Sequence, residues 1–113
     1  MSPTMRMTEH EYRWGTVVTL AVDGEPAEVS AQGLDEWVER AARQHGAALT
    51  EIRLDLTGTA GLSAEGLRGL MVAHQRIGRR VRIVLAGVGP EAAESIRRTG
   101  VDRVVVVEES DEV

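Results

Sequence analysis

Short aliphatic runs alternate along this chain with longer segments of helical periodicity, and this alternation constrains the fold more than any other feature. The runs cover residues 17–22, 51–56, 81–86 and 104–107. Connections of helical length between successive strands favour parallel strands joined by right-handed crossovers. A chain of 113 residues is long enough to bury one core and is expected to form one domain. The pattern therefore predicts a single α/β domain.

Each helical segment carries signals for its start and its end. A serine or a proline stands where the helix is expected to begin, and a glycine stands where it is expected to stop. Apolar residues recur at helical spacing between these limits. The predicted helices therefore run between three pairs of residues: Ser30 and Gly46, Ser63 and Gly78, and Pro90 and Gly100.

A short edge strand with a turn at Gly15 is predicted to precede the first aliphatic run, so the chain should open with a hairpin. The expected order is β-β-α-β-α-β-α-β. We predict a single-layer mixed β-sheet of about five strands, with the helices mainly on one face. The expected organisation is disorder over residues 1–9, a domain over 10–107 and an acidic, solubilising tail over 108–113.

Composition excludes several classes of function. The chain has no cysteine, and its three histidines are scattered without metal-ligand spacing, so no metal site or other cofactor is expected. A formal net charge of -5 argues against nucleic acid as a main partner. One basic cluster stands out. We interpret it as cations at a helix carboxyl end together with a solvated edge, and it contains Arg76, Arg79, Arg80 and Arg82.

No targeting or membrane-spanning pattern is evident in the sequence. Residues 1–8 lack the apolar core of a signal peptide. No apolar run approaches the ~20 residues that a membrane helix needs. We therefore expect a soluble cytoplasmic protein that does not insert into a membrane.

The stretch 54–67 concentrates the candidate functional residues. It reads as a buried strand, a turn rich in glycine and the first turn of a helix. The start of a helix exposes unpaired N–H groups and a partial positive charge, which favours anions. This chain places its own carboxylate, Glu65, at that position. If Glu65 only stabilises the helix, its interaction with the helix dipole would contribute ~0.3–1 kcal/mol to stability.

Five short motifs in this order resemble those of the STAS domain, a family that includes anti-sigma factor antagonists and regulatory domains of sulfate transporters. The resemblance extends from about Trp14 to Val107. The motifs are Val22-Asp23-Gly24-Glu25, Leu54-Asp55-Leu56-Thr57-Gly58, Gly66-Leu67, Leu85-Ala86-Gly87-Val88 and Thr99-Gly100-Val101-Asp102-Arg103-Val104.

The resemblance implies a non-catalytic, regulatory protein that switches between protein partners. In that family the loop after the third strand typically reads Asp-Ser-Ser-Gly-Leu. Its second serine is phosphorylated by a serine kinase that is also an anti-sigma factor. The corresponding residues here are Ser63-Ala64-Glu65-Gly66-Leu67, so Glu65 occupies the phosphoacceptor position. A carboxylate there would partly mimic phosphoserine, with less charge and fewer acceptor oxygens.

The partner-binding surface implied by the resemblance surrounds this loop. Ser63 is the alternative phosphorylation site, although its simplest role is to cap the helix. The predicted partner is an anti-sigma factor that is a serine kinase, or a related regulatory protein. The predicted partner-binding residues are Thr57, Gly58, Thr59, Ser63, Ala64, Glu65, Gly66 and Arg68.

Two other classes of function stay open at this point. A scaffold or a helper subunit of a transport complex would not need the phosphorylation switch. A nucleotide-binding domain is a further alternative, because Gly58, Gly61 and Gly66 surround a strand-to-helix turn. The Walker pattern and the Gly-x-Gly-x-x-Gly pattern are both absent, and Glu65 would repel a phosphate. The sequence leaves homodimerisation undecided.

Overall fold

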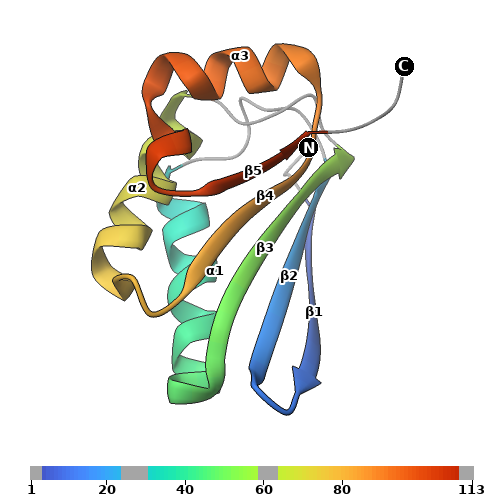
Figure 1. The fold of residues 1–113 in the computed structure, drawn as a ribbon, viewed down its shortest axis with the longest axis vertical. Coiled ribbons are helices and arrows are strands. Elements are labelled where there is room, and N and C mark those ends of the chain that lie inside the picture. The colour runs from blue at the N-terminus through green and yellow to red at the C-terminus, as the bar shows by residue number, and fades with distance from the viewer. Residues whose placement is uncertain (1–3, 24–30, 59–63, 110–113) are drawn as a thin grey trace.

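The computed structural model describes residues 4–23, 31–58 and 64–109, and these form a mixed five-stranded sheet with three α-helices (Figure 1). The fold class and the predicted order β-β-α-β-α-β-α-β are confirmed. The elements are β1 (Thr4–Tyr12), β2 (Gly15–Asp23), α1 (Ala31–His45), the 3-10 turn η2 (Gly46–Ala48), β3 (Leu49–Gly58), α2 (Ala64–Ile77), β4 (Arg82–Val88), α3 (Pro90–Thr99), the 3-10 turn η3 (Val101–Arg103) and β5 (Val106–Glu109).

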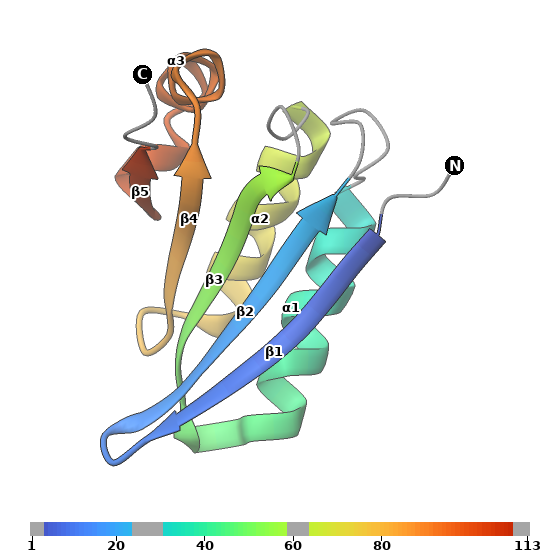
Figure 2. The ribbon, with the colours of Figure 1, turned by 90° about the vertical axis from the view of Figure 1, so that its right-hand side faces the viewer.

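The strands lie side by side in their order along the chain. β1 pairs with β2 in an antiparallel hairpin, whereas β2, β3, β4 and β5 are parallel neighbours (Figure 2). Helix-length connections between the parallel strands explain this arrangement. As a result the carboxyl ends of β2, β3 and β4 lie at the same end of the sheet.

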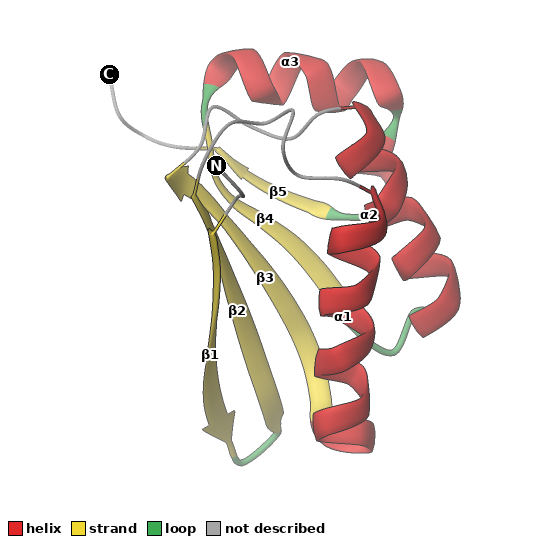
Figure 3. Ribbon diagram, turned by 180° about the vertical axis from the view of Figure 1, so that it is seen from behind, coloured by secondary structure: helices red, strands yellow, loops and turns green. Residues whose placement is uncertain are grey.

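Two helices cover one face of the sheet, and the third lies at its end. α1 and α2 pack side by side over the inner face, while α3 crosses the end of β4 and β5 (Figures 1 and 3). Alternate residues of each central strand point to the helices and are buried, as in Leu54 and Leu56 of β3. The strand and helix residues of this core are aliphatic, and they include Val18, Leu20, Val38, Ile52, Leu67, Leu70, Ile83 and Leu85.

The chain becomes ordered earlier than the sequence predicted. Residues 4–9, expected to be disordered, lie in β1 and pair with β2 along its length. Met7 packs against the core, and Glu9 lies 3.3 Å from the His45 side chain at the end of α1. The prediction failed because this strand has few apolar residues, and its order comes from the hairpin and these tertiary contacts. Residues 1–3 lie outside the described residues.

The last strand also differs from the prediction, which placed it at 104–107. The turn η3 continues the chain after α3, and the N–H groups of Val104 and Val105 both donate to the carbonyl oxygen of Val101 at 3.0 Å. This delays β5 until Val106. Glu108 and Glu109, predicted in the acidic tail, therefore belong to β5, and Glu109 pairs with Arg97 at 2.6 Å.

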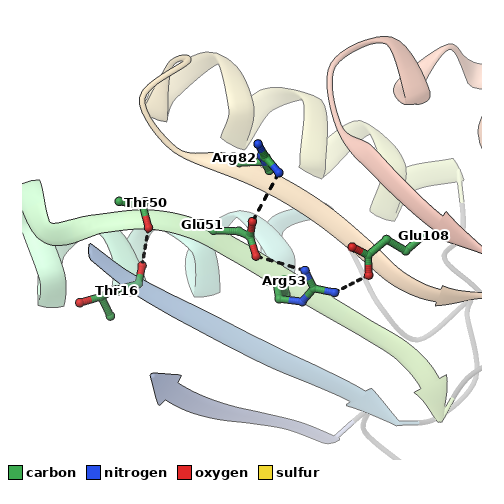
Figure 4. A network of polar contacts seen from close by, with 6 residues as sticks. All are labelled: Thr16, Thr50, Glu51, Arg53, Arg82 and Glu108. Atoms are coloured by element: carbon green, nitrogen blue, oxygen red, sulfur yellow. Dashed lines mark hydrogen bonds and ion pairs between the residues drawn. The ribbon is translucent and has the colours of Figure 1, made fainter. Parts of the chain in front are cut away.

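A polar network lies on the face of the sheet opposite the helices (Figure 4). Arg53 donates hydrogen bonds to Glu108 of β5 and to Glu51 of its own strand, the latter at 3.1 Å. The hydrogen bond to Glu108 raises the pKa of the Arg53 guanidinium above its ordinary value, against the opposing effect of burial, and Glu51 adds to the rise. The network ties β5 to the centre of the sheet.

No helix in the part of the chain that the structure describes is long and apolar enough to cross a membrane.

Candidate functional site

The predicted partner-binding surface lies where β3 ends and α2 begins. β3 ends at Gly58 and α2 begins at Ala64, so both elements bring their residues to the carboxyl end of the sheet (Figure 2). The carboxyl ends of parallel strands are where α/β folds usually present functional loops. The structure therefore brings together the predicted residues at the end of β3 with those in the first turn of α2.

A local hydrogen-bond pair fixes the end of β3. One carboxylate oxygen of Asp55 accepts from the Thr57 N–H at 3.0 Å and from the Thr57 hydroxyl at 2.7 Å. Aspartate often bonds in this way to backbone groups two residues further on. The hydroxyl of Thr57 is thus engaged, although the side chain is exposed. Asp55 orients the first residue of the predicted surface.

A close approach between β4 and Thr57 fixes the same corner from the other side. Gly87 has a φ of +69°, and a Cβ at this position would lie 2.3 Å from Cγ2 of Thr57. Only glycine fits both this left-handed conformation and this contact. The motifs Leu54-Asp55-Leu56-Thr57-Gly58 and Leu85-Ala86-Gly87-Val88 therefore meet at this point.

The first turn of α2 carries the rest of the described site. Ala64 is exposed and Arg68 is exposed, while Gly66 is buried and Leu67, only 1% exposed, packs in the core. Glu65 is the second residue of the helix, where the unpaired N–H groups favour an anion. By helical period, position 65 lies on the same side of α2 as the exposed Val72.

Some predicted site residues cannot be placed. Thr59 and Ser63 lie outside the described residues, as do Gly61 and the predicted cap interaction of Ser63. The side chain of Glu65 is likewise outside what the structure describes. The backbone nevertheless begins α2 at the residue that follows Ser63.

Within residues 4–23, 31–58 and 64–109, no three His, Asp or Glu side chains gather where they could hold a metal ion. The described part of the site consists of a threonine, small residues, a carboxylate position and an arginine. Such an arrangement can form hydrogen bonds and ion pairs with another protein.

The comparison with protein families decides the classification. The family model of the STAS domain matches residues 11–112, which is nearly the whole chain. The chain belongs to the STAS domain family. No curated protein matches the sequence closely enough to count as a relative.

Solved structures share this STAS fold at low sequence identity. An anti-sigma factor antagonist from Mycobacterium paratuberculosis is 20% identical with a TM-score of 0.65, and the match covers 93% of this chain and 86% of that one. The anti-sigma factor antagonist SpoIIAA in its unphosphorylated form is 14% identical with a TM-score of 0.59, covering 95% and 90%. An uncharacterized protein with a SpoIIAA-like fold from Shewanella loihica is 11% identical with a TM-score of 0.62, and the match covers 99% of this chain and 90% of that one.

Sequence reasoning missed how the motifs of the STAS domain support one another. It identified Asp55 and Gly87 as parts of motifs, but not as the two residues that position Thr57. An Asp-x-Thr sequence at a strand end is a recognisable signal for the first contact. No sequence signal gives the second, because residues 57 and 87 meet only through the pairing of β3 with β4.

Proposed function

We propose that this STAS domain is a non-catalytic regulatory module that binds an anti-sigma factor or a related serine kinase through the surface between β3 and α2. The family match over residues 11–112 is the observation that carries the proposal. Two structures with the same fold are described as anti-sigma factor antagonists. The proposal includes a cytoplasmic location, where such a partner would control a sigma factor.

The positions of the candidate residues support this surface. Thr57 is exposed and held by Asp55, and Ala64 and Arg68 are exposed on the first turn of α2. Gly66 and Leu67 face inward, which anchors the helix to the core. The end of β3 and the start of α2 flank the segment that the proposed partner would contact.

Glu65 would hold the protein permanently in a state that resembles the phosphorylated form of an antagonist. We propose that its carboxylate, at the positive end of α2, partly imitates a phosphoserine and so weakens binding to a kinase that prefers the unphosphorylated state. The protein would then resemble the released form of an antagonist, or would bind a partner with a complementary cation.

The test compares wild type with Glu65→Ser in binding to the cognate anti-sigma kinase. Glu65→Ser should bind about tenfold more tightly or better, because it removes an anion from the interface. It should also accept phosphate from ATP, and the modification should reverse the gain. Calorimetry and mass spectrometry measure the two effects.

Glu91→Ser is the matched control. Glu91 is the second residue of α3, so its replacement removes a carboxylate from the same position of another helix. It should leave kinase binding unchanged. Tight binding by wild type that Glu65→Ser does not alter would contradict mimicry. Failure of wild type and Glu65→Ser alike to bind the kinase would contradict the proposed partner.

A scaffold role is the second candidate. The Shewanella loihica structure is described only as an uncharacterized protein with a SpoIIAA-like fold, so its description favours neither role. A scaffold subunit should co-purify in a stable complex whether residue 65 is Glu or Ser. An antagonist should show a partner whose affinity depends on this residue.

A further inference from the structure

A cavity of about 450 Å³ lies away from the proposed partner surface, between the carboxyl end of α2, the start of β4 and the segment from η3 to β5. This volume is within the range of small-molecule sites, ~300–1,000 Å³. We refer to the cavity as the basic pocket. Its lining consists of His74, Arg79, Val81, Arg82, Ile83, Arg103 and Val104.

The charge of the basic pocket is unbalanced. Three arginines and a histidine line it, and no acidic residue does. Within the part of the chain that the structure describes, the side chains of His74, Arg79 and Arg103 make no hydrogen bond or ion pair. Arg82 lies 3.9 Å from Glu51, beyond hydrogen-bond distance (Figure 4). The pocket therefore offers cationic donors that are not satisfied within the described chain.

A neighbouring cavity shows what a balanced arrangement looks like. A space of about 370 Å³ between α1 and α2 is lined by three arginines but also by Glu39. There Arg76 donates to Glu39 at 2.8 Å and to Asp35 at 2.9 Å. The basic pocket lacks any such carboxylate.

The dipole of α2 does not by itself explain why these cations come together in the basic pocket. Basic residues near the carboxyl end of α2 complement its dipole, which accounts for His74 and Arg79. Arg82 belongs to β4 and Arg103 to η3, so the dipole of α2 does not account for them. Three separate elements thus bring cations to one recess, where a bound anion would reduce the repulsion between them.

We propose that the basic pocket binds a soluble phosphate monoester. Guanidinium groups match the geometry of phosphate oxygens and can bind them in pairs. Arg79 and Arg103, which come from different segments of the lining, would supply the phosphate contacts, together with His74 and Arg82. Val104, 39% exposed, offers apolar surface to the organic part of the ester. This binding is independent of the proposed partner function, because it involves the opposite end of the sheet.

The test titrates the full ¹⁵N-labelled chain with phenyl phosphate at constant ionic strength, with chloride and phenol as control ligands. We expect saturable shifts of the amides at residues 79–83 and 103–104, and none from either control. Arg79→Gln and Arg103→Gln should each weaken binding about tenfold, the usual effect of losing one charge-assisted hydrogen bond.

Two arginines serve as matched controls. Arg80 is next to Arg79 but lines the neighbouring cavity, and Arg98 is an exposed arginine of α3. Arg80→Gln and Arg98→Gln should change the affinity less than twofold. Melting curves of each variant establish that it is folded. Absence of saturation, an equal loss in the control variants, or unchanged affinity in Arg103→Gln would each overturn the proposal.

Discussion

The two ends of the sheet are built in different ways. At the carboxyl end, close backbone contacts and short hydrogen bonds hold Thr57 between Asp55 and Gly87. At the amino end of β4, cations from three elements surround an open recess. The arginines among them are donors only, so they cannot bond to one another. The first end carries motifs of the family. At the second end only Arg103 and Val104 belong to those motifs, and the other lining residues lie outside them. Replacing a residue at the first end should therefore lower the free energy of unfolding. Replacing a cation of the basic pocket should leave it unchanged or raise it.

Gly87→Ala should have the largest effect on the carboxyl end. It combines strain at a φ of +69° with a Cβ 2.3 Å from Cγ2 of Thr57. We expect a loss of about 2–4 kcal/mol in the free energy of unfolding, measured by urea denaturation. Gly89→Ala is the control, since a Cβ there meets nothing within 4 Å, and it should cost less than about 1 kcal/mol.

A double variant tests the physical cause. Thr57→Ser removes Cγ2 but keeps the hydroxyl that bonds Asp55. Combined with Gly87→Ala it should restore part of the lost stability, leaving the cost of the backbone conformation. If Thr57→Ser restores nothing, the close approach is not what requires glycine at residue 87.

Asp55→Ala should have a smaller effect at the same end. It removes the acceptor of both Thr57 hydrogen bonds and should cost about 1 kcal/mol in unfolding free energy, because the site is exposed and water replaces the acceptor. Partner affinity should fall further than stability does. Asp102→Ala, an exposed control, should stay within about 0.5 kcal/mol of wild type. An Asp55→Ala protein with unchanged partner affinity would contradict the positioning role.

Arg53→Gln probes the sheet between the two ends. It breaks a partly buried ion pair to Glu51 and a more exposed one to Glu108, and should cost about 0.2–1 kcal/mol. The loss should shrink at high salt. The raised pKa means that the charged guanidinium is favoured in the folded state, so this contribution is present at neutral pH and declines only as the pH rises past the ordinary pKa of arginine. A salt-independent loss would indicate packing rather than charge.

Arg103→Gln at the amino end should have the smallest effect, with the opposite sign. It relieves repulsion among the lining cations and should leave the unfolding free energy unchanged or raise it by up to about 0.5 kcal/mol. Thermal melting without added anions measures this. A clear loss of stability would mean that Arg103 is structural, and would remove the contrast between the ends.

The sequence predicted the central architecture well, because aliphatic runs and helix-ending glycines act locally. Gly100, for example, ends α3 in the left-handed conformation with a φ of 77°. The errors came where order depends on distant partners. Residues 4–9 belong to β1 through their pairing with β2, and Glu108 of β5 is bonded to Arg53 of β3. The sequence showed Arg79 and Arg82 in one basic cluster, but it did not show that Arg103 joins them at one recess, because this happens only in the folded chain.

Mapping of the partner interface tests the central proposal most directly. The ¹⁵N-labelled chain is titrated with its anti-sigma kinase, and Glu65→Ser is titrated in parallel. The account predicts amide shifts at residues 57–58 and 64–68, stronger in Glu65→Ser, with none at residues 79–83. Shifts confined to another face, such as the hairpin of β1 and β2, would contradict it.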